Sequence, residues 1–452
     1  MKNLLTLLFY SLSVSVLIGQ AVSKTRVTVL EKSPENTIIR LDLTGVDQRT
    51  VVTPQGEAVV VSMSQGTPLL QAGAPDVPKF ATTLHIPNTG NMVYSILDSE
   101  FQEFQNVSVA PSKGDLKRIV DPATVPFKYG TAYEHDAFFP GQLADLKNPF
   151  ILRDKRGQGL WMYPVQYNPV SKVLRVYSSI TIAVSSSSGT GENEIPGDKK
   201  RSSSNTFNQL YQKIFINHTA SGQRNEGEPE KMLVIAEDEF VEDLEPLVTW
   251  KRQMGIHTTV VPLSEIGSSA SGDIHNFVKN YYETHAITYL LLVGGEDAIE
   301  PEMRQDGGNY SCDNCFGYLD GPDYAPEVFV GRYHAETVDQ LKIMVQRNLD
   351  YEKTPLVDEA QNWCATGMWS ASNEGMGIGD DNQADFEHAN AWKAAQLEDG
   401  YTKYWEFYDG NHADISPTPG NETADQNGNP VNTQLVDLMN NHGVSIYNYT
   451  GH

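Results

Sequence analysis

Short runs of β-branched and aromatic residues recur along the N-terminal part of the chain, and turn-forming residues separate them. Runs of this kind, bounded by Gly, Pro, Asn or Asp, are typical of strands. They occur at residues 25–30, 37–43, 58–62, 92–96 and 173–184. Helical periodicity is rare over the same stretch. The pattern therefore predicts an all-β N-terminal domain, a β-sandwich over residues 24–184.

From residue 232 the pattern of apolar positions changes, and strands alternate with helices. Buried strands are expected at residues 232–236, 258–262, 289–293, 327–330, 363–368, 404–408 and 444–449. Between them lie amphipathic segments, such as residues 273–282, whose apolar residues share one helical face. Alternation with short connections predicts an α/β domain over residues 232–452 with a mostly parallel, doubly wound sheet.

A polar segment, residues 185–231, separates the two patterns. It is rich in Ser, Gly and charged residues, so it cannot bury enough apolar surface to remain ordered alone. Exposed links are the preferred sites of proteolysis, and we expect processing after Arg224 or, alternatively, after Arg201. A β domain, an exposed linker and a second domain together have the organisation of a zymogen.

Residues 1–23 have the pattern of a cleaved export signal. Lys2 precedes an apolar run over residues 4–18, and Ala21 and Ser23 supply small residues near the expected cleavage position. No second apolar stretch approaches the roughly 20 residues needed to cross a bilayer. We therefore expect a protein that is secreted or at the cell surface, with no transmembrane segment.

The composition narrows the class of function. With 452 residues, 39% of them hydrophobic and 10% aromatic, the chain is long enough for two or three globular domains. A formal net charge of -25 argues against nucleic acid or anionic lipid as a partner, and it suits basic substrates and cations that take oxygen ligands. Gly294 and Gly295 follow an expected strand, but the glycine spacings of nucleotide-binding loops are absent, which argues against a nucleotide enzyme.

Three cysteines are present. Cys312 and Cys315 form one Cys-x-x-Cys pair, which is a weak zinc signal without a second pair or a nearby pair of histidines. We expect either a disulfide within the loop or two free thiols. Cys364 lies in an apolar strand pattern and is predicted to be a core residue.

A histidine, His452, follows the expected strand at residues 444–449. Catalytic groups gather at the carboxyl ends of strands in an open α/β sheet, and an imidazole there can act as a general base near neutral pH. A Gly-rich loop after the strand at residues 363–368 crosses the same edge and leads from Glu374 to Asp385, where a helix is expected to begin. A carboxylate beside the imidazole would fix its tautomer. Position alone also allows a frayed end at His452 and a helix-capping acid at Asp385.

The last nine residues, Val-Ser-Ile-Tyr-Asn-Tyr-Thr-Gly-His, resemble the motif around the catalytic histidine of the gingipain family, secreted bacterial cysteine endopeptidases with a caspase-like fold. The likeness extends over residues 232–452. It implies that His452 is the catalytic base, that Glu374 supports it, and that Asp385 lines the pocket for a basic P1 side chain. Protein or peptide substrates would be cut after Arg or Lys.

In the family pattern the chain continues past this histidine to the nucleophilic Cys, and none of the three cysteines here matches that position. The resemblance therefore implies a precursor truncated between base and nucleophile, which should be inactive alone. The β domain resembles the family's propeptide in position, size and character, and we expect it to remain bound as an intramolecular inhibitor. The alternative is a secreted binding module without chemistry, or a propeptide-type peptidase inhibitor.

An acidic turn with Gly and Pro is the candidate metal site. Its carboxylates and carbonyls are the hard oxygen ligands that Ca²⁺ takes. By resemblance to the gingipain pattern, Asp323 and Glu327 match calcium ligands, and the backbone of Asp320 and Ala325 can contribute carbonyls. His388 can join from the neighbouring helix. The alternative is a solvated acidic turn.

Overall fold

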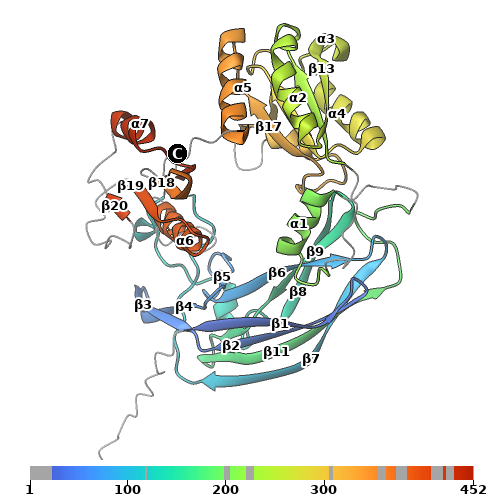
Figure 1. Cartoon of the computed structure of the whole chain (residues 1–452). Helices are drawn as coiled ribbons and strands as arrows, with labels where there is room; N and C mark the ends of the chain where they lie inside the picture. The colour runs from blue at the N-terminus through green and yellow to red at the C-terminus, as the bar shows by residue number, and fades with distance from the viewer. Residues whose placement is uncertain are drawn as a thin grey trace, which may run out of the picture.

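The computed structural model describes residues 23–117, 120–197, 204–219, 229–304, 309–353, 363–372, 384–408, 421–423 and 432–450. Three parts follow one another along the chain: the β region (residues 23–187), the first lobe (229–353) and the second lobe (363–450). In Figure 1 the β region lies at the bottom, the first lobe at the upper right and the second lobe at the left.

Antiparallel strands build the β region, which confirms that the N-terminal part is rich in strands. One sheet contains β1 (Lys24–Lys32), β2 (Asn36–Thr44), β11 (Val173–Ser187), β10 (Val165–Asn168) and β7 (Asn91–Phe104). A second contains β5 (Thr67–Pro68), β6 (Pro78–Ile86), β9 (Lys155–Met162) and β8 (Ala144–Leu152), and a separate hairpin contains β3 (Asp47–Thr53) and β4 (Gly56–Ser62). Both sheets contribute to one apolar core, because burial alternates along the strands, as at Ile39 and Leu41 of β2 and Leu84 and Ile86 of β6.

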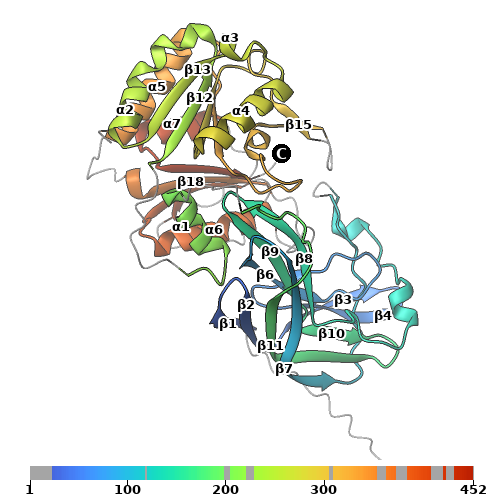
Figure 2. The ribbon, with the colours of Figure 1, turned by 90° about the vertical axis from the view of Figure 1, so that its right-hand side faces the viewer.

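The first lobe is a parallel sheet covered by helices on both faces. The strand order is β13 (His257–Pro262), β12 (Lys231–Ala236), β14 (Tyr289–Val293) and β17 (Phe329–Tyr333). Leu233 and Ile235 of β12 pack against α4 (Ser271–His285), whereas Val234 and Ala236 pack against α2 (Glu245–Gln253) and α5 (Val338–Lys353). Figure 2 shows α2 and α5 on one side of these strands and α4 on the other. Short elements α3 (Leu263–Ile266), β15 (Glu302–Arg304) and β16 (Tyr310–Cys312) complete the lobe.

The second lobe has its own four-stranded parallel sheet. Its order is β20 (Asn421–Thr423), β19 (Lys403–Tyr408), β18 (Thr366–Ala371) and β21 (Ile446–Thr450). Trp369 of β18 packs toward α6 (Asp385–Glu398), and Met368 packs toward α7 (Asn432–Asn441) on the other face. Strands β18 and β19 are buried along almost their whole length, as expected of parallel strands that helices cover on both faces.

The division into two sheets corrects the expectation of one doubly wound sheet. Among the described strands β17 pairs with β14, and β18 pairs with β19 and β21, so no pairing joins the two lobes. The order of elements predicts parallel strands, and that prediction is confirmed. Hydrophobic periodicity indicates which residues of a strand are buried, but it does not indicate which strand lies beside it. The pairing of β17 and β18 with their neighbours could therefore not be predicted from the sequence pattern.

A helix that the sequence pattern did not predict lies within residues 185–231. This helix, α1 (Asn205–Ile214), begins after Ser204, whose side chain accepts a hydrogen bond from the amide of Phe207. Phe207, Tyr211 and Phe215 are buried with Leu152 of the β region, and Phe329 of the first lobe packs against them. Figure 1 shows α1 between the β region and the first lobe. The i, i+4, i+8 spacing of its aromatics was the available signal.

The cysteines divide into a pair and a single thiol. Cys312 and Cys315 are joined in a disulfide, which settles the alternatives for that pair. Cys364 is a free, exposed cysteine in the short 3-10 turn Trp363–Ala365, so the prediction that it is a core residue was wrong. The buried strand begins only at Thr366, after the turn has ended. Among the described helices, none is long and apolar enough to cross a bilayer.

Candidate active site

The second sheet presents an edge at which three parallel strands end together. Ala371, the last residue of β18, lies beside Tyr408 at the end of β19 and beside Thr450 at the end of β21. The next residue, Ser372, donates its amide N–H to the carbonyl oxygen of Thr450 at 2.9 Å. This is the edge to which the sequence assigned the catalytic residues. The ends of β18 and β21 are therefore fixed relative to one another.

Asp385 is the first residue of α6 and is fully buried at this edge. Its Oδ2 accepts a hydrogen bond from the Ser372 hydroxyl at 2.6 Å, and the amide of Phe386 donates to the Ser372 carbonyl at 3.2 Å. The position before the helix belongs to Ala384, whose amide N–H donates to Glu387 Oε2 at 2.7 Å. Asp385 is therefore an acid in the first turn of α6, one of the alternatives that its position allowed, and the end of β18 holds its carboxylate.

The other catalytic candidates, His452 and Glu374, lie outside the described residues, as do Arg201 and Arg224. The structure therefore places one of the three proposed active-site residues, Asp385. It also adds Ser372, which sequence reasoning missed. A hydroxyl at the end of a buried strand, followed by a Gly-rich loop, was the available signal.

A buried ion pair joins α6 to the strand β19, on which it packs. Lys393 of α6 and Glu406 of β19 are almost completely buried and form a short ion pair. The Tyr408 hydroxyl donates to Glu406 at 2.8 Å and to the Asn390 side chain at 3.1 Å. A buried charge needs such partners because desolvation is costly. Sequence reasoning missed this pair, since a helical Lys usually reads as a solvated residue, although Lys393 shares the face of Asp385 and Ala389.

The acidic turn before β17 carries four of the proposed calcium ligands, Asp320, Asp323, Ala325 and Glu327. Glu327 is fully buried, and its Oε2 accepts the amide N–H groups of Leu319 at 2.7 Å and Asp320 at 3.1 Å. Its Oε1 is buried with no hydrogen-bond partner in the described part of the chain. Burial raises the pKa of Glu327 to about 8, and the charges of Asp320 and Asp323 add to the rise.

One feature of the turn suits a hard cation, and the others do not complete a site for it. An orphaned buried carboxylate oxygen beside two further acids fits a divalent cation, which would satisfy the oxygen and neutralise the charge. Asp323 Oδ2, however, accepts hydrogen bonds from the Ile151 amide at 2.8 Å and the Asn193 side chain at 3.2 Å, both from the N-terminal part. The described residues contain no group of three or more His, Cys, Asp or Glu side chains placed to hold a metal. His388, half-buried on α6, is not brought into such a group.

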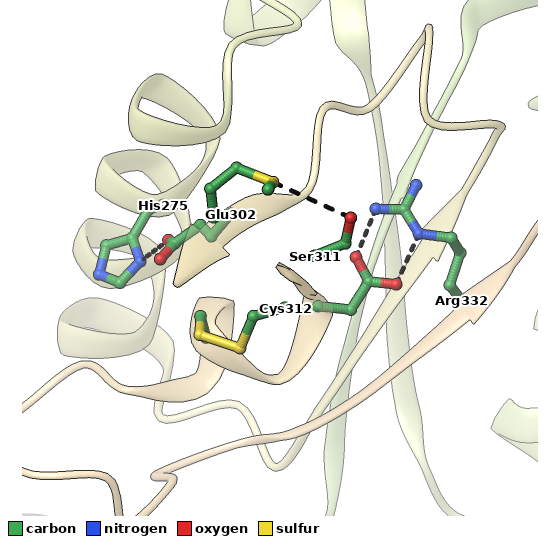
Figure 3. Close-up of a disulfide and its surroundings, with 8 residues drawn as sticks. His275, Glu302, Ser311, Cys312 and Arg332 are labelled. Carbon is green, nitrogen blue, oxygen red and sulfur yellow. Dashed lines mark hydrogen bonds and ion pairs between the residues drawn. A yellow bond between two sulfur atoms is a disulfide. The ribbon is translucent and has the colours of Figure 1, made fainter. Parts of the chain in front are cut away.

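The loop that carries the disulfide is fixed to the carboxyl end of the first sheet. Arg332 of β17 makes a two-pronged ion pair with Asp313, at 2.7 Å and 2.6 Å, and donates to the carbonyls of Gly294 and Ile299. Figure 3 shows this pair beside the Cys312–Cys315 disulfide, with the His275–Glu302 pair on the other side of the loop. The bidentate guanidinium fixes both position and orientation. The disulfide therefore belongs to the packing of the first lobe and not to the edge that holds Asp385.

The β region lies against the beginning of α6. A cavity of about 520 Å³ is lined by Lys113, Leu116 and Asp121 of the β region and by Glu387, two residues after Asp385. The loops of the β region thus reach the helix that carries the candidate specificity residue. This arrangement brings the N-terminal part next to the first turn of α6, which also carries Asp385.

Two family models together match most of the chain: Propeptide_C25 matches residues 20–225, and Peptidase family C25 matches residues 225–452. Gingipain R2 of Porphyromonas gingivalis is 34% identical over 435 residues, which cover 94% of this chain and 55% of that protein. Gingipain R1 of the same organism is 32% identical over 468 residues, which cover 100% of this chain and 44% of that protein. The chain thus spans about half the length of these curated relatives.

Solved structures were compared as well. A complex of the pro- and mature domains of RgpB from Porphyromonas gingivalis is 34% identical, covers 42% of this chain and 97% of that chain, and has a TM-score of 0.40. The crystal structure of the Arg-specific cysteine proteinase gingipain R is 30% identical, covers 50% of this chain and 48% of that chain, and has a TM-score of 0.41.

Proposed function

The chain belongs to peptidase family C25, and we propose that it is the exported precursor of a gingipain-like cysteine endopeptidase whose own β region keeps it latent. The two family models meet at residue 225, in the polar segment before the first lobe. The observation that carries the proposal is the buried Asp385, held by Ser372 where β18 and β21 end. The sequence resemblance assigns the specificity group for a basic P1 side chain to this residue.

Asp385 is proposed as the anionic floor of the P1 pocket. A buried carboxylate binds a long basic side chain through charge-assisted hydrogen bonds, and these are bidentate for Arg. An apolar side chain in the same pocket would leave the charge unpaired. The Ser372 hydroxyl donates to one oxygen of this carboxylate and so fixes its position at the sheet edge. Cleavage after Arg or Lys follows from this arrangement.

His452 is proposed as the general base, with Glu374 as its support. The imidazole would take the proton of a cysteine thiol, and the thiolate would attack the peptide carbonyl. The imidazolium would then return the proton to the leaving amine. Cys312 and Cys315 are joined in a disulfide, and Cys364 precedes β18 at the opposite end from Ser372, so none of them is assigned as the nucleophile.

The β region is proposed to be the propeptide that inhibits the enzyme from within the same chain. Its position in front of α6, where Lys113 and Glu387 line one cavity, supports this role. Processing after Arg224 or Arg201 would separate it from the first lobe. We further propose export through residues 1–23, which gives a secreted or surface-bound enzyme.

Ca²⁺ is proposed as a structural ion at the turn before β17. Glu327 would hold it through the orphaned oxygen, with Asp323, the carbonyls of Asp320 and Ala325, and His388 as the remaining proposed ligands. When bound, the ion would supply positive charge to a buried acidic turn. Asp323 would contribute fully only when the hydrogen bonds from Ile151 and Asn193 are weakened.

Expression of the gene's complete reading frame tests the proposed function. The secreted protein should cleave peptides with Arg or Lys at P1, and an alkylating peptide with Arg at P1 should label a single cysteine, identified by mass spectrometry. The variant His452→Ala should lose both turnover and labelling. If the wild-type protein shows neither turnover nor labelling, the peptidase proposal fails and the binding-module or inhibitor alternative replaces it.

A further inference from the structure

The turn between β8 and β9 places a charged side chain inside the protein. Leu152 pairs with Lys155 in the hairpin, so Arg153 and Asp154 form a two-residue turn. Arg153 has a left-handed backbone, with φ of 57°, and its side chain is only 1% exposed. Turn residues with long charged side chains are normally solvated, and a left-handed backbone is uncommon outside Gly, Asn and Asp. The position therefore calls for a specific explanation.

The guanidinium of Arg153 reaches out of the β region and into the first lobe. Its Nη1 donates to the carbonyl oxygens of Ile287 at 2.7 Å and Glu327 at 3.0 Å, and its Nη2 donates to that of Ala286 at 3.0 Å. Three backbone acceptors of the other part thus satisfy one side chain. They replace the water that the charge would otherwise bind.

The acceptors lie where a positive charge is favoured. Ala286 is the residue that ends α4, and the carbonyl groups at a helix carboxyl end carry partial negative charge. The guanidinium also lies over the rings of Phe207 of α1 and Tyr282 of α4, with its central carbon 5.0 Å and 5.7 Å from the ring centres. Stacking of this kind suits the planar guanidinium of Arg better than the ammonium of Lys.

Neighbouring contacts hold the same hairpin in place. The Tyr211 hydroxyl of α1 donates to the Leu152 carbonyl at 3.1 Å and to Asp154 Oδ1 at 2.6 Å. The amide of Ile151 donates to Asp323 Oδ2 at 2.8 Å. The hairpin tip is therefore fixed by contacts with α1 and with the first lobe.

This contact is separate from the one that faces the candidate active site. Ile287 and Glu327 immediately precede β14 and β17, so the hairpin tip docks at the amino edge of the first sheet. The contact near Glu387 involves α6 of the second lobe, which follows the carboxyl end of β18. The β region thus contacts the two lobes at two different places.

We propose that the β8–β9 hairpin tip, with Arg153 as its buried side chain, is an anchor that keeps the β region bound after the linker is cut, independently of the contact that covers α6. The inference rests on the proposed propeptide role. Two contacts on one rigid body raise the effective concentration of each, so the contact at α6 can open and close while the β region stays attached. The amino edge of the first lobe therefore binds the β8–β9 hairpin of the same chain.

A nicked full chain tests the anchor. A site for a specific protease is inserted after Arg224, the purified protein is cut there, and the dissociation constant of the two fragments is measured by size-exclusion chromatography over a dilution series. Arg153→Ala should weaken the complex about 100-fold, as expected for a buried interfacial arginine. Arg153→Lys should weaken it about tenfold, because a single ammonium cannot reach all three carbonyls. Hydrogen exchange at residues 285–289 should rise in both variants.

Arg175→Ala is the matched control. Arg175 forms an ion pair with Glu103 within the β region, at 2.6 Å. Its replacement should leave the dissociation constant within about twofold of the wild-type value. If Arg153→Ala matches this control, the anchor is refuted. Should Arg153→Ala unfold the hairpin, Tyr282→Leu tests the anchor with the hairpin intact, because it removes a ring of α4 over which the guanidinium lies. Tyr282→Leu should also weaken the complex, and a dissociation constant equal to that of the Arg175→Ala control would refute the anchor. Since the measurement is fragment dissociation, a lack of peptidase activity would overturn the proposed function alone.

Discussion

The hydroxyl oxygen of Ser372 lies 2.6 Å from Oδ2 of Asp385, across the gap between the end of β18 and the start of α6. These residues are separated by twelve others, of which residues 373–383 carry the Gly-rich stretch. The hydrogen bond therefore fixes the carboxylate at the sheet edge.

Replacing Asp385 by Ala should remove the preference for basic P1 residues. A buried charge that loses its partner costs on the order of 3 to 5 kcal/mol, so kcat/KM for Arg and Lys substrates should fall by about two to three orders of magnitude. Substrates with Leu at P1 should be cut at an unchanged rate. The measurement is kcat/KM over a P1-varied peptide panel with the protein from the complete reading frame.

Glu398→Ala is the control for that panel, because Glu398 is an exposed acid at the opposite end of the same helix. It should leave the P1 preference intact. Glu374→Ala should lower kcat/KM for every substrate alike, since this residue is proposed to act on His452. Equal losses for Arg, Lys and Leu in Asp385→Ala would return Asp385 to a structural role at the start of α6.

Removal of divalent cations should destabilise the protein. Binding at a concentration of 100 times Kd stabilises the folded state by about 2.7 kcal/mol, which corresponds to a fall in Tm of roughly 5 to 10 °C when EDTA is added. Glu327→Gln should have a lower Tm in Ca²⁺ and little further response to EDTA. Glu57→Gln, an exposed acid of the β3–β4 hairpin, should behave like the wild type. An EDTA-insensitive Tm in the wild type would rule out the ion.

The β region should lose stability in mild acid because of His85. Burial lowers the pKa of His85 from 6.5 to about 4, and the charges of Lys155 and His218 act in the same direction. The neutral ring is favoured in the folded state, so this contribution is fully present above pH 6.5 and is lost as the pH falls toward 4. Allowing for partial exposure, the loss amounts to about 1 to 2 kcal/mol.

Urea unfolding of wild type and His85→Gln between pH 7 and 4 measures this contribution as the difference between the two curves. Asp76→Asn provides a control of opposite sign. Burial raises the pKa of Asp76 to about 6, so the protonated acid is favoured and stability falls as the pH rises from 3.8 to 6. A difference between wild type and His85→Gln that is constant across the pH range would contradict the prediction.

Of the three cysteines in residues 1–452, only Cys364 should be labelled in the native protein. Cys364 is free and exposed, whereas Cys312 and Cys315 are joined. Iodoacetamide should modify one of these three positions in the folded protein and the other two after reduction and unfolding, as counted by peptide mass mapping. Cys364→Ser should take up none before reduction. Two or three adducts on the unreduced native protein would show that the disulfide does not form in solution.

Periodicity predicted local structure well and pairing poorly. The strand at β12, the helix at α4 and the start of α6 at Asp385 fell where burial at periods of two and 3.6 residues indicated them. The position of each of these elements depends mainly on residues that are close together in the sequence. The division into two sheets depends on which buried strands lie side by side, and alternation of strand and helix carries no information about that choice.

The sequence analysis did not identify the charged residues that the fold buries. Nothing in the local sequence marks Lys393 or Arg153 as buried, because their partners, Glu406 and the carbonyls of the first lobe, become neighbours only in the folded chain. The hydrogen bond between Arg153 and Ile287 spans 134 residues. Asp385 could be placed at a sheet edge from the sequence, but its burial and its hydrogen bond to Ser372 needed the folded chain.

Helix α1 packs against both the β region and the first lobe, and this has a consequence for the order in which they fold during synthesis. The core of the β region is drawn from residues 39–184, with Ile216 at its margin, so it can form as soon as those residues are made. Phe207 and Arg153 obtain their remaining neighbours only after Phe329 and Glu327 have been synthesised. Domains generally fold as units from the amino end, and long-range contacts form last. The β region should therefore fold before the first lobe is complete. The amino edge of that lobe would then fold in contact with the β region.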